Sequence, residues 1–398
     1  MSYIFPTTPK PPDFEIDWEC LDHASRWLMG VGFDALVNCM QNEVYHSEGS
    51  VWNHTKMVLE ELVKMDEWRE LSESDRSLMF LAVLFHDIGK PDKTVVDDDG
   101  YIGSRGHARK GATLARSLVE ELDDCSEENM SFDFKNTICN LVSRHGIATL
   151  SIPLSGSNAT NDPYRRVAES SYLAGCKFSC MIARADMRGR IVQDKNVVKE
   201  ALDSIDFFEE IARDLGCWDR PLMFVNGHTR FRYFNHWGNM SSLVPPDYEM
   251  FDDTKFEVTL LCGIPGVGKD HLIKKRFKGA NIVSLDDIRL NMGVSPKDNQ
   301  GVVSQEAMKA CRVILRDKQP FVFNATNLTR SIRQKLIGLF YDYHARTKII
   351  HLVAPLETIK ERNSGRDKKV PENVIHKLFL KTEVPTLMEC HSLERIES

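Results

Sequence analysis

The chain has 398 residues, of which 42% are hydrophobic and 27% are charged, and its formal net charge is −7. This length and composition exclude a disordered or fibrous protein and suffice for two domains with separate hydrophobic cores. The ten cysteines form no C-x-x-C pair and no even framework of spacings, so we interpret them as reduced thiols of a cytoplasmic protein. We expect neither a secretory leader nor a membrane helix, because no apolar run approaches about 18 residues.

Charge is distributed unevenly along the chain. From Phe256 onward there are 24 Lys and Arg against 16 Asp and Glu, whereas the preceding part has 27 against 42. The C-terminal part is therefore positively charged and could attract a polyanion, while the N-terminal part is acidic. For most individual charges, a solvated surface position is the default interpretation.

Residues 18–218 have the periodicity of helices. Apolar residues recur there at spacings of three and four, as at Leu78, Leu81, Ala82 and Phe85. We predict an all-α domain at residues 1–220, followed by a linker or structured connection at residues 221–255. The connection contains turn-forming pairs such as Asn226-Gly227, but its aromatic residues, Trp237 among them, argue against a flexible tether.

The helical part contains histidines and acidic residues in an order typical of a metal site. These are His54, the adjacent pair His86-Asp87, His107, His145 and Asp186. A neighbouring His and Asp can both bind one cation, and distant His and Asp residues then complete its ligands. Lys90, close to the pair, is a candidate for binding a phosphate oxygen of a substrate.

The segments 46–55, 84–91 and 184–189 resemble the HD phosphohydrolases, and more narrowly the HD domains attached to some tRNA nucleotidyltransferases. The resemblance covers about residues 42–190. It implies a first metal site formed by His54, His86, Asp87 and Asp186. His107 and His145 then fit a second metal bridged by Asp87, or they bind phosphate in a one-metal variant of the fold.

The resemblance also implies a hydrolase that acts on phosphoesters. The metal is a divalent transition ion, and a His/Asp set accepts Mn²⁺, Ni²⁺, Co²⁺, Zn²⁺ or Fe²⁺. His46 also lies in the motif, and we interpret it as a structural or substrate-contacting residue. Several basic residues near these ligands are candidates for contacts with a nucleic-acid backbone: Arg105, Arg109, Lys110, Arg144, Arg165 and Arg166.

From residue 256 onward, short apolar segments alternate with helical ones. The predicted strands cover residues 257–262, 281–285, 320–324 and 348–354. Such alternation is typical of a parallel sheet covered by helices. The predicted fold class is therefore an all-α bundle at residues 1–220 followed, at residues 256–398, by an α/β domain with a central parallel sheet.

The segment Gly263-x-x-Gly266-x-Gly268-Lys269 directly follows the first predicted strand and precedes a predicted helix at residues 269–277. In this context glycines let backbone N–H groups surround a nucleotide phosphate, and Lys269 reaches the phosphoryl group that is transferred. We expect ATP or another NTP to bind here with Mg²⁺. One position is unusual, because Asp270 stands where Ser or Thr normally contributes a hydroxyl to Mg²⁺.

Later segments resemble the phage-type polynucleotide 5′-kinases in order and spacing: Ser284 to Arg289, Thr326 to Leu328, and Glu361 to Arg366 with Val370-Pro371. The resemblance covers about residues 258–378. It implies that Asp286 accepts the proton of a 5′-hydroxyl, that Arg289 holds the acceptor phosphate, and that Arg362 or Arg366 contacts the ATP phosphates from a lid.

Two acidic positions of the kinase segment remain open to interpretation. Asp287 is a rival for the role of base, and spacing favours Asp286. The acid that the family carries just before the Thr-Asn pair is missing, since Asn324-Ala325 occupy that place. We infer that Asp270 replaces this carboxylate at the metal.

Together the two halves resemble bacterial bifunctional proteins in which an HD phosphohydrolase precedes a P-loop polynucleotide kinase. This implies repair of nucleic-acid ends, RNA in preference to DNA. The kinase would phosphorylate a 5′-hydroxyl, the HD domain would remove a 2′,3′-cyclic, 2′- or 3′-phosphate, and a ligase would join the repaired ends. Two alternatives remain: an enzyme of nucleotide metabolism that combines a nucleotidase with a small-molecule kinase, and a non-catalytic ATP-binding switch.

Overall fold

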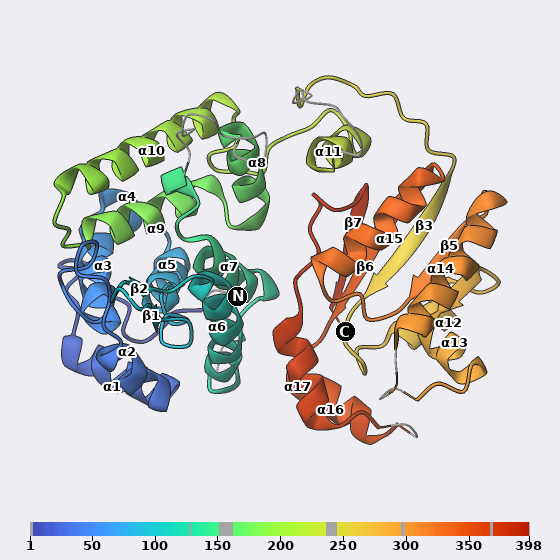
Figure 1. Cartoon of the computed structure of the whole chain (residues 1–398), viewed down its shortest axis with the longest axis horizontal. Helices are drawn as coiled ribbons and strands as arrows, with labels where there is room; N and C mark the ends of the chain where they lie inside the picture. The colour runs from blue at the N-terminus through green and yellow to red at the C-terminus, as the bar shows by residue number, and fades with distance from the viewer. Residues whose placement is uncertain are drawn as a thin grey trace. The chain divides into compact units, whose positions relative to one another are not determined.

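A computed structural model describes residues 3–126, 129–150, 162–235, 245–295, 298, 300–366 and 369–397. The chain divides into two compact units, Met1–Met223 and Phe224–Ser398, which are drawn in Figure 1. The predicted fold class is confirmed, because the first unit is a helical bundle and the second contains a five-stranded parallel sheet. Among the described residues, no helix combines the length and apolar character needed to cross a membrane.

The first unit is built from ten α-helices and a short hairpin within the described residues. The helices are α1 (Trp18–Met29), α2 (Val31–Asn38), α3 (Val51–Lys64), α4 (Asp66–Arg69), α5 (Glu73–Phe85), α6 (His107–Asp124), α7 (Phe132–Arg144), α8 (Pro163–Leu173), α9 (Cys176–Arg188) and α10 (Lys195–Asp214). A 3₁₀ turn, Ala148–Leu150, follows α7. The strands β1 (Val95–Val96) and β2 (Ile102–Gly103) pair antiparallel, and two-residue strands are too short for sequence periodicity to reveal.

Helix α5 lies at the centre of the helical unit and determines where its polar cluster forms. Ser72 caps the helix by accepting a hydrogen bond from the backbone N–H of Asp75. Every residue from Arg76 to Phe85 is buried, and the helix packs against α3, α7 and α9 (Figure 1). Because α5 is enclosed on all sides, the two residues that follow it, His86 and Asp87, enter the interior of the unit.

The second unit contains a doubly covered parallel sheet. Its elements are α11 (Gly227–Phe234), β3 (Phe256–Cys262), α12 (Lys269–Arg276), β4 (Asn281–Ser284), α13 (Leu285–Asn291), α14 (Gln300–Arg316), β5 (Phe321–Asn324), α15 (Arg330–Asp342), β6 (Ala345–Val353), α16 (Leu356–Ser364), α17 (Glu372–Lys381) and β7 (Ser392–Glu397). The strand order is β4-β5-β3-β6-β7, and every pairing is parallel. The first strand of the sheet, β3, therefore lies between β5 and β6, so the strand order reverses beside it. In such sheets, ligands bind beyond the carboxyl ends of the strands at the point of reversal.

Alternate residues of the strands form two separate cores. Leu260 and Phe323 pack with residues of α11, α14 and α15 on one face. Leu261 and Val322 pack with residues of α12, α16 and α17 on the other. This alternation follows from the two-residue period of a strand, and it fixes the carboxyl ends of β3, β4 and β5 at one edge.

Part of the predicted connection at residues 221–255 belongs to the core of the second unit. Asn226 caps α11, and Phe231 of this helix is fully buried in the core formed with α14 and α15. Arg230 donates hydrogen bonds to the backbone carbonyls of Leu387 and His391, just before β7. Trp237 lies outside the described residues.

Candidate active sites

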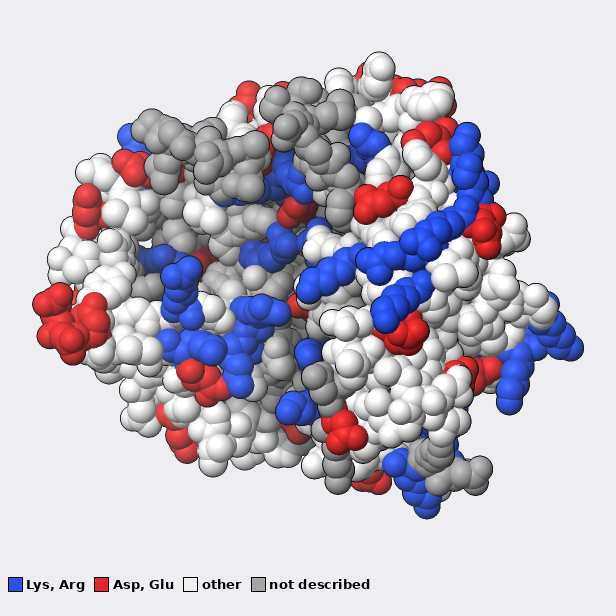
Figure 2. Space-filling model, turned by 45° about the vertical axis from the view of Figure 1, so that its right-hand side comes forward, with Lys and Arg blue, Asp and Glu red and all other residues white. Residues whose placement is uncertain are grey.

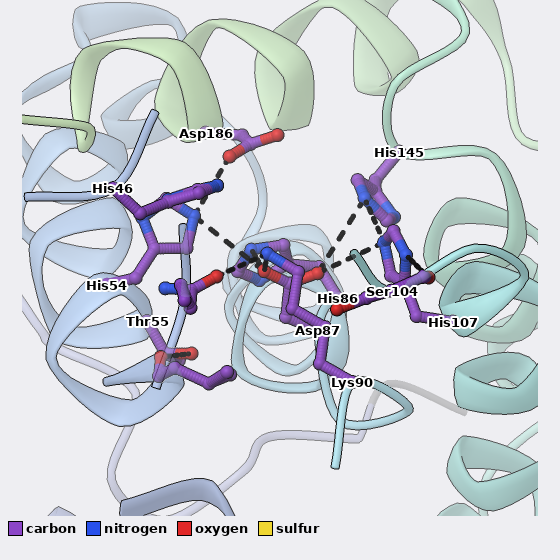
Figure 3. A network of polar contacts seen from close by, with 12 residues as sticks. His46, His54, Thr55, His86, Asp87, Lys90, Ser104, His107, His145 and Asp186 are labelled. Carbon is purple, nitrogen blue, oxygen red and sulfur yellow. Dashed lines mark hydrogen bonds and ion pairs between the residues drawn. The ribbon is translucent and has the colours of Figure 1, made fainter. Parts of the chain in front are cut away.

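Five helices bring the histidine and acidic residues singled out in the first unit to one place. Helix α3 carries His54, and His86 and Asp87 follow the end of α5 (Figure 3). His107 begins α6, His145 follows α7, and Asp186 lies in α9. All are buried except His107, which is partly exposed.

Asp87 lies at the centre of this cluster. Its Oδ2 is 3.3 Å from His86 Nε2 and 3.8 Å from His54 Nε2, while its Oδ1 is 3.3 Å from His107 Nε2 and 3.9 Å from His145 Nε2. The atoms around Asp87 fall into two groups, each compact enough to hold one ion, and Asp87 is common to both. This is the arrangement expected of a carboxylate that bridges two ions. A third compact group, formed by His46, Glu48 and His54, does not include Asp87.

Three of the histidine rings are oriented in the same way by the backbone. The Nδ1 atoms of His86, His107 and His145 each lie 2.7–2.9 Å from the carbonyl oxygen three residues earlier in the chain. An Nδ1–H that donates to a carbonyl fixes the tautomer and leaves Nε2 as an acceptor. All three Nε2 atoms therefore face Asp87 as potential ligands.

Glu48 and Arg190 hold the other half of the cluster, and sequence analysis did not identify either residue. One oxygen of Glu48 is 2.8 Å from His54 Nδ1 and 2.8 Å from His46 Nδ1. Arg190 donates two hydrogen bonds to Asp186, whose Oδ1 is 3.0 Å from His54 Nε2. Asp186 lies in α9 and Arg190 lies two residues beyond its end, so their four-residue spacing is a signal that could have revealed Arg190, whereas nothing local marks Glu48.

Lys90 also contacts the cluster. Its Nζ is 2.6 Å from Asp87 Oδ2 and donates a hydrogen bond to Gln41 Oε1, another residue that sequence analysis missed. Burial alone would raise the pKa of Asp87, but Lys90 and the neighbouring histidines hold this pKa well below its usual range. Burial lowers the pKa of His145 to about 4, which keeps the ring neutral and able to bind a metal.

Two features of the cluster fit a divalent cation: its histidine and carboxylate side chains, and its buried polar atoms that lack a hydrogen-bond partner. Within the described part of the chain, His86 Nε2 and Asp87 Oδ1 are buried and lack a hydrogen-bond partner. Burying such atoms without a partner is costly, and a cation that accepts their lone pairs removes this cost. The residues therefore fit the metal that the sequence predicts.

In the second unit, the loop after β3 forms the cradle of a phosphate-binding loop. Gly266 has a φ of 89°, and a Cβ there would lie 3.2 Å from the carbonyl oxygen of Ile359. A Cβ on Gly263 would lie 2.9 Å from the carbonyl oxygen of Leu352. Gly268 also has a positive φ, of 104°, and it directly precedes α12. Because other residues would be strained or would clash at these positions, the glycines are required by the backbone path.

Lys269 folds back over this loop. Its Nζ donates hydrogen bonds to the carbonyl oxygens of Gly263 and Ile264, at 2.8 and 3.0 Å. Lys269 is partly exposed, but desolvation lowers its pKa to about 8. The negative charges of Asp270 and Asp286 oppose this lowering of the pKa, and the positive charge of Arg366 adds to it. Asp286 and Arg366 are thus near enough to act electrostatically on Lys269.

The predicted acceptor residues lie on α13, at the carboxyl end of β4. Ser284 caps the helix, and Asp286 forms an ion pair with Arg289. Arg289 also donates a hydrogen bond to Gln300 on α14, at 2.8 Å. The side chain of Asp286 is 80% exposed, so its carboxylate is open to solvent. Arg362 is exposed on α16.

Asp270 and Asn324, the two unusual positions, are in contact. Asn324 Nδ2 donates a hydrogen bond to Asp270 Oδ1 at 3.0 Å. The following Thr-Asn pair has a structural role, because the Thr326 carbonyl accepts from the Gly263 N–H and Asn327 donates to the Leu261 carbonyl. The end of β5 is thereby fixed beside the phosphate-binding loop.

Comparison with known families finds one matching domain in each unit. A model of the HD domain matches residues 51–161, and a model of an AAA domain matches residues 258–385. The chain therefore contains an HD domain followed by a P-loop kinase-like domain. P-loop kinases use ATP and Mg²⁺, and HD domains bind divalent metals, in agreement with the predicted cofactors.

Individual relatives each match about a third of the chain. The L-seryl-tRNA(Sec) kinase of Methanococcus maripaludis is 26% identical over 133 residues, which are 32% of this chain and 52% of the relative. The chain thus spans about half the length of this relative. Solved structures of a kinase candidate from Chloroflexus aurantiacus and a sugar kinase from Janibacter sp. are each 16% identical. They cover 35% and 36% of this chain and 87% and 86% of their own, with TM-scores of 0.31 and 0.29.

Proposed function

We propose that this protein repairs nucleic-acid ends, RNA in preference to DNA, with one activity in each unit. The P-loop domain transfers the γ-phosphoryl group of ATP to a 5′-hydroxyl, and the HD domain removes a 2′,3′-cyclic, 2′- or 3′-phosphate. Both products are then suitable for a ligase that joins a 5′-phosphate to a 3′-hydroxyl. The observation that carries this proposal is the ion pair of the exposed Asp286 with Arg289 at the carboxyl end of β4, where Asp286 also acts electrostatically on Lys269.

The kinase half of the proposal assigns a role to each residue at this edge of the sheet. Asp286 accepts the proton of the 5′-hydroxyl, and Arg289, already paired with it, binds the terminal phosphate of the acceptor. Lys269 and the lid arginines, Arg362 and Arg366, bind the phosphates of ATP. In-line transfer needs a positioned base and cations around the equatorial oxygens, and these residue types supply them.

The HD half assigns metal binding to His54, Asp186 and the residues around Asp87. A divalent cation bound there would polarise the phosphoester and lower the pKa of a bound water. Lys90 is placed to bind a phosphate oxygen in exchange for its contact with Asp87. Arg105 and Arg109 are exposed on either side of His107 and are candidates for holding the nucleic-acid backbone.

A polymeric acceptor is favoured by exposure and by charge. A base that is 80% exposed can be reached by the end of a long chain, whereas kinases of small molecules enclose their acceptors. The part from Phe256 onward is positively charged, and Figure 2 shows Lys and Arg side chains gathered on the surface of both units. The relative from Methanococcus maripaludis is named for an RNA-linked acceptor, L-seryl-tRNA(Sec), which also supports an RNA substrate.

Transfer of labelled phosphate from ATP tests the kinase. We expect transfer to a 5′-hydroxyl oligoribonucleotide and none to the same oligonucleotide with a 5′-phosphate. Replacing Asp286 with Asn should lower the rate by about 10²- to 10⁴-fold, the usual contribution of a general base. Efficient transfer to free nucleosides but not to the oligonucleotide would instead indicate nucleotide metabolism, and ATP binding without transfer to any acceptor would indicate a switch.

An oligoribonucleotide ending in a 2′,3′-cyclic phosphate tests the HD domain. The protein loaded with Mn²⁺, Ni²⁺ or Co²⁺ should open the ring or release phosphate, and chelation should abolish this activity. Asp87→Asn should abolish it as well, because Asp87 belongs to two of the three candidate metal groups. Hydrolysis of free nucleotides with an inert oligonucleotide would contradict the proposed substrate.

A further inference from the structure

We propose that the Mg²⁺ ligands of the P-loop domain are exchanged in this chain, so that Asp270 supplies the carboxylate and Asn324 the neutral oxygen. P-loop phosphotransferases normally hold Mg²⁺ with a Ser or Thr hydroxyl directly after the loop lysine and with a separate carboxylate. Here the residue after Lys269 is acidic, and the residue at the end of β5 is an amide. The inference rests on the P-loop part of the proposed function and deepens it.

The contact between the two side chains is the first support. Asn324 Nδ2 donates to Asp270 Oδ1 at 3.0 Å, although β5 and α12 are separated by more than 40 residues of sequence. Strand β5 pairs with β3, whose carboxyl end leads into the phosphate-binding loop. The two residues thus lie in one place, at the edge where the phosphates of a nucleotide bind.

The unsatisfied oxygen of Asn324 is an independent observation. The side chain is 8% exposed, and within the described residues its Oδ1 is buried without a hydrogen-bond partner. An amide that donates to Asp270 through its nitrogen presents its oxygen elsewhere, and a buried amide oxygen without a partner costs free energy. A hard cation beside the nucleotide would satisfy it.

The charge of the site explains why an exchange is tolerated. Mg²⁺ binds hard oxygen ligands and needs few from the protein when phosphates supply others. One carboxylate and one neutral oxygen are present whether the acid follows the lysine or ends the strand. A carboxylate at both positions would place two negative charges side by side near the phosphates, and no carboxylate would weaken the metal. The change at Asp270 is therefore matched by the change at Asn324.

The test compares the full-length protein with Asp270→Ser and with the double variant Asp270→Ser/Asn324→Asp, which places a hydroxyl after Lys269 and a carboxylate at the end of β5. The measurement is the ratio of the Kd of a non-hydrolysable ATP analogue in EDTA to its Kd in saturating Mg²⁺. This ratio isolates the contribution of Mg²⁺ and requires no acceptor. We expect Asp270→Ser to lower the ratio by at least about 10-fold, the lower end of losses seen even for outer-shell partners of a metal.

The double variant should return the ratio to within about three-fold of the starting protein, and the surface control Asp342→Ser should leave it unchanged. Asp270→Asn, which keeps an acceptor for Asn324, gives a second variant in case the first fails to fold, and it should show the same loss. An unchanged ratio in Asp270→Asn, or a double variant as weak as Asp270→Ser, would overturn the exchange. Because no oligonucleotide is involved, these outcomes are separate from failure of the end-repair proposal.

Discussion

At the scale of single residues, the cluster around Asp87 depends on partners that surround it. The ring of His54 is held between Glu48 at Nδ1 and Asp186 at Nε2, and the same oxygen of Glu48 contacts His46. The other oxygen of Glu48 accepts from the backbone N–H of Ile191, directly after Arg190. Glu48 thus links the entry of α3 to the exit of α9 and orients the ring of His54.

Glu48→Gln should weaken metal binding while leaving the candidate ligands around Asp87 in place. A glutamine can still contact one histidine, but it lacks the charge that makes His54 a better donor, so we expect metal affinity to fall by about 10- to 100-fold. Calorimetric titration with Mn²⁺ measures this. The matched control is Glu43→Gln, an exposed acid in the same segment. Equal affinities of the two variants would contradict a positioning role for Glu48.

At the scale of elements, the turn that follows α5 and the start of α6 are packed unusually closely. A Cβ on Gly89 would lie 2.2 Å from the backbone carbonyl oxygen of His107 and 2.5 Å from the backbone nitrogen of Gly111. Backbone cannot move aside as a flexible side chain can. Gly89 therefore allows the turn that carries His86 and Asp87 to touch the helix that begins with His107.

Gly89→Ala should separate α6 from this turn. We expect a loss of stability of about 1–3 kcal/mol, the usual cost of overpacking, together with weaker metal binding because His107 moves away from Asp87. Thermal melting with and without Mn²⁺ measures both effects. Gly146→Ala is the control, since the nearest atom to its added Cβ would be 3.8 Å away. A melting temperature equal to that of the control would show that the contact is not close.

The attachment of α11 and β7 to the second unit depends on a neutral histidine. His391 Nδ1 accepts from the Thr347 N–H at 3.1 Å, and its ring stacks on Phe231 with centroids 4.2 Å apart. Burial lowers the pKa of His391 to about 3. An unfolded histidine has a pKa of about 6.5, so between these values the unfolded chain binds a proton that the folded chain does not. Stability therefore falls as the pH falls from about 7 towards 3.

His391→Asn should remove this pH dependence. Between pH 4 and 6, the slope of the free energy of unfolding against pH should be smaller than in the unmodified protein, by up to about 1.4 kcal/mol per pH unit. At pH 7 the free energy of unfolding itself should be lower than in the unmodified protein. Hydrogen exchange of the slowest β6 amides measures this free energy at each pH. His376→Asn, at an exposed position, should keep the original slope. An unchanged slope in His391→Asn would mean that the folded protein protonates this ring at no cost.

Local signals predicted most of the fold and the residues that the structure gathers around Asp87, and long-range contacts account for what was missed. Strands β3 to β6 are apolar, and the predicted strands overlap them, whereas β7 has partly exposed, mostly polar residues and resembles no buried strand. Helix α11 follows a turn-forming pair, and its burial comes from α14 and α15. Glu48 and Gln41 reach the cluster from a loop, so only the fold brings them there.

At the scale of the whole molecule, each site lies within one unit. The ligand cluster is built from α3, α5, α6, α7 and α9, and the phosphate-binding loop lies at an edge of a sheet with its own two cores. The described residues that form the two sites belong to different units, Met1–Met223 and Phe224–Ser398. A defect in one site should therefore leave the other unchanged, since sites without shared partners behave additively.

Complementation between two defective proteins tests this independence. Lys269→Ala should lose phosphoryl transfer, and Asp87→Asn should lose removal of the terminal phosphate, each with the other activity retained. On an RNA carrying both a 5′-hydroxyl and a 2′,3′-cyclic phosphate, each variant alone should give a half-repaired product. An equimolar mixture should repair both ends at a rate near that of the unmodified protein at half its concentration, because the RNA can leave one molecule and bind another. Accumulation of half-repaired RNA in the mixture would show instead that both sites must act within one chain.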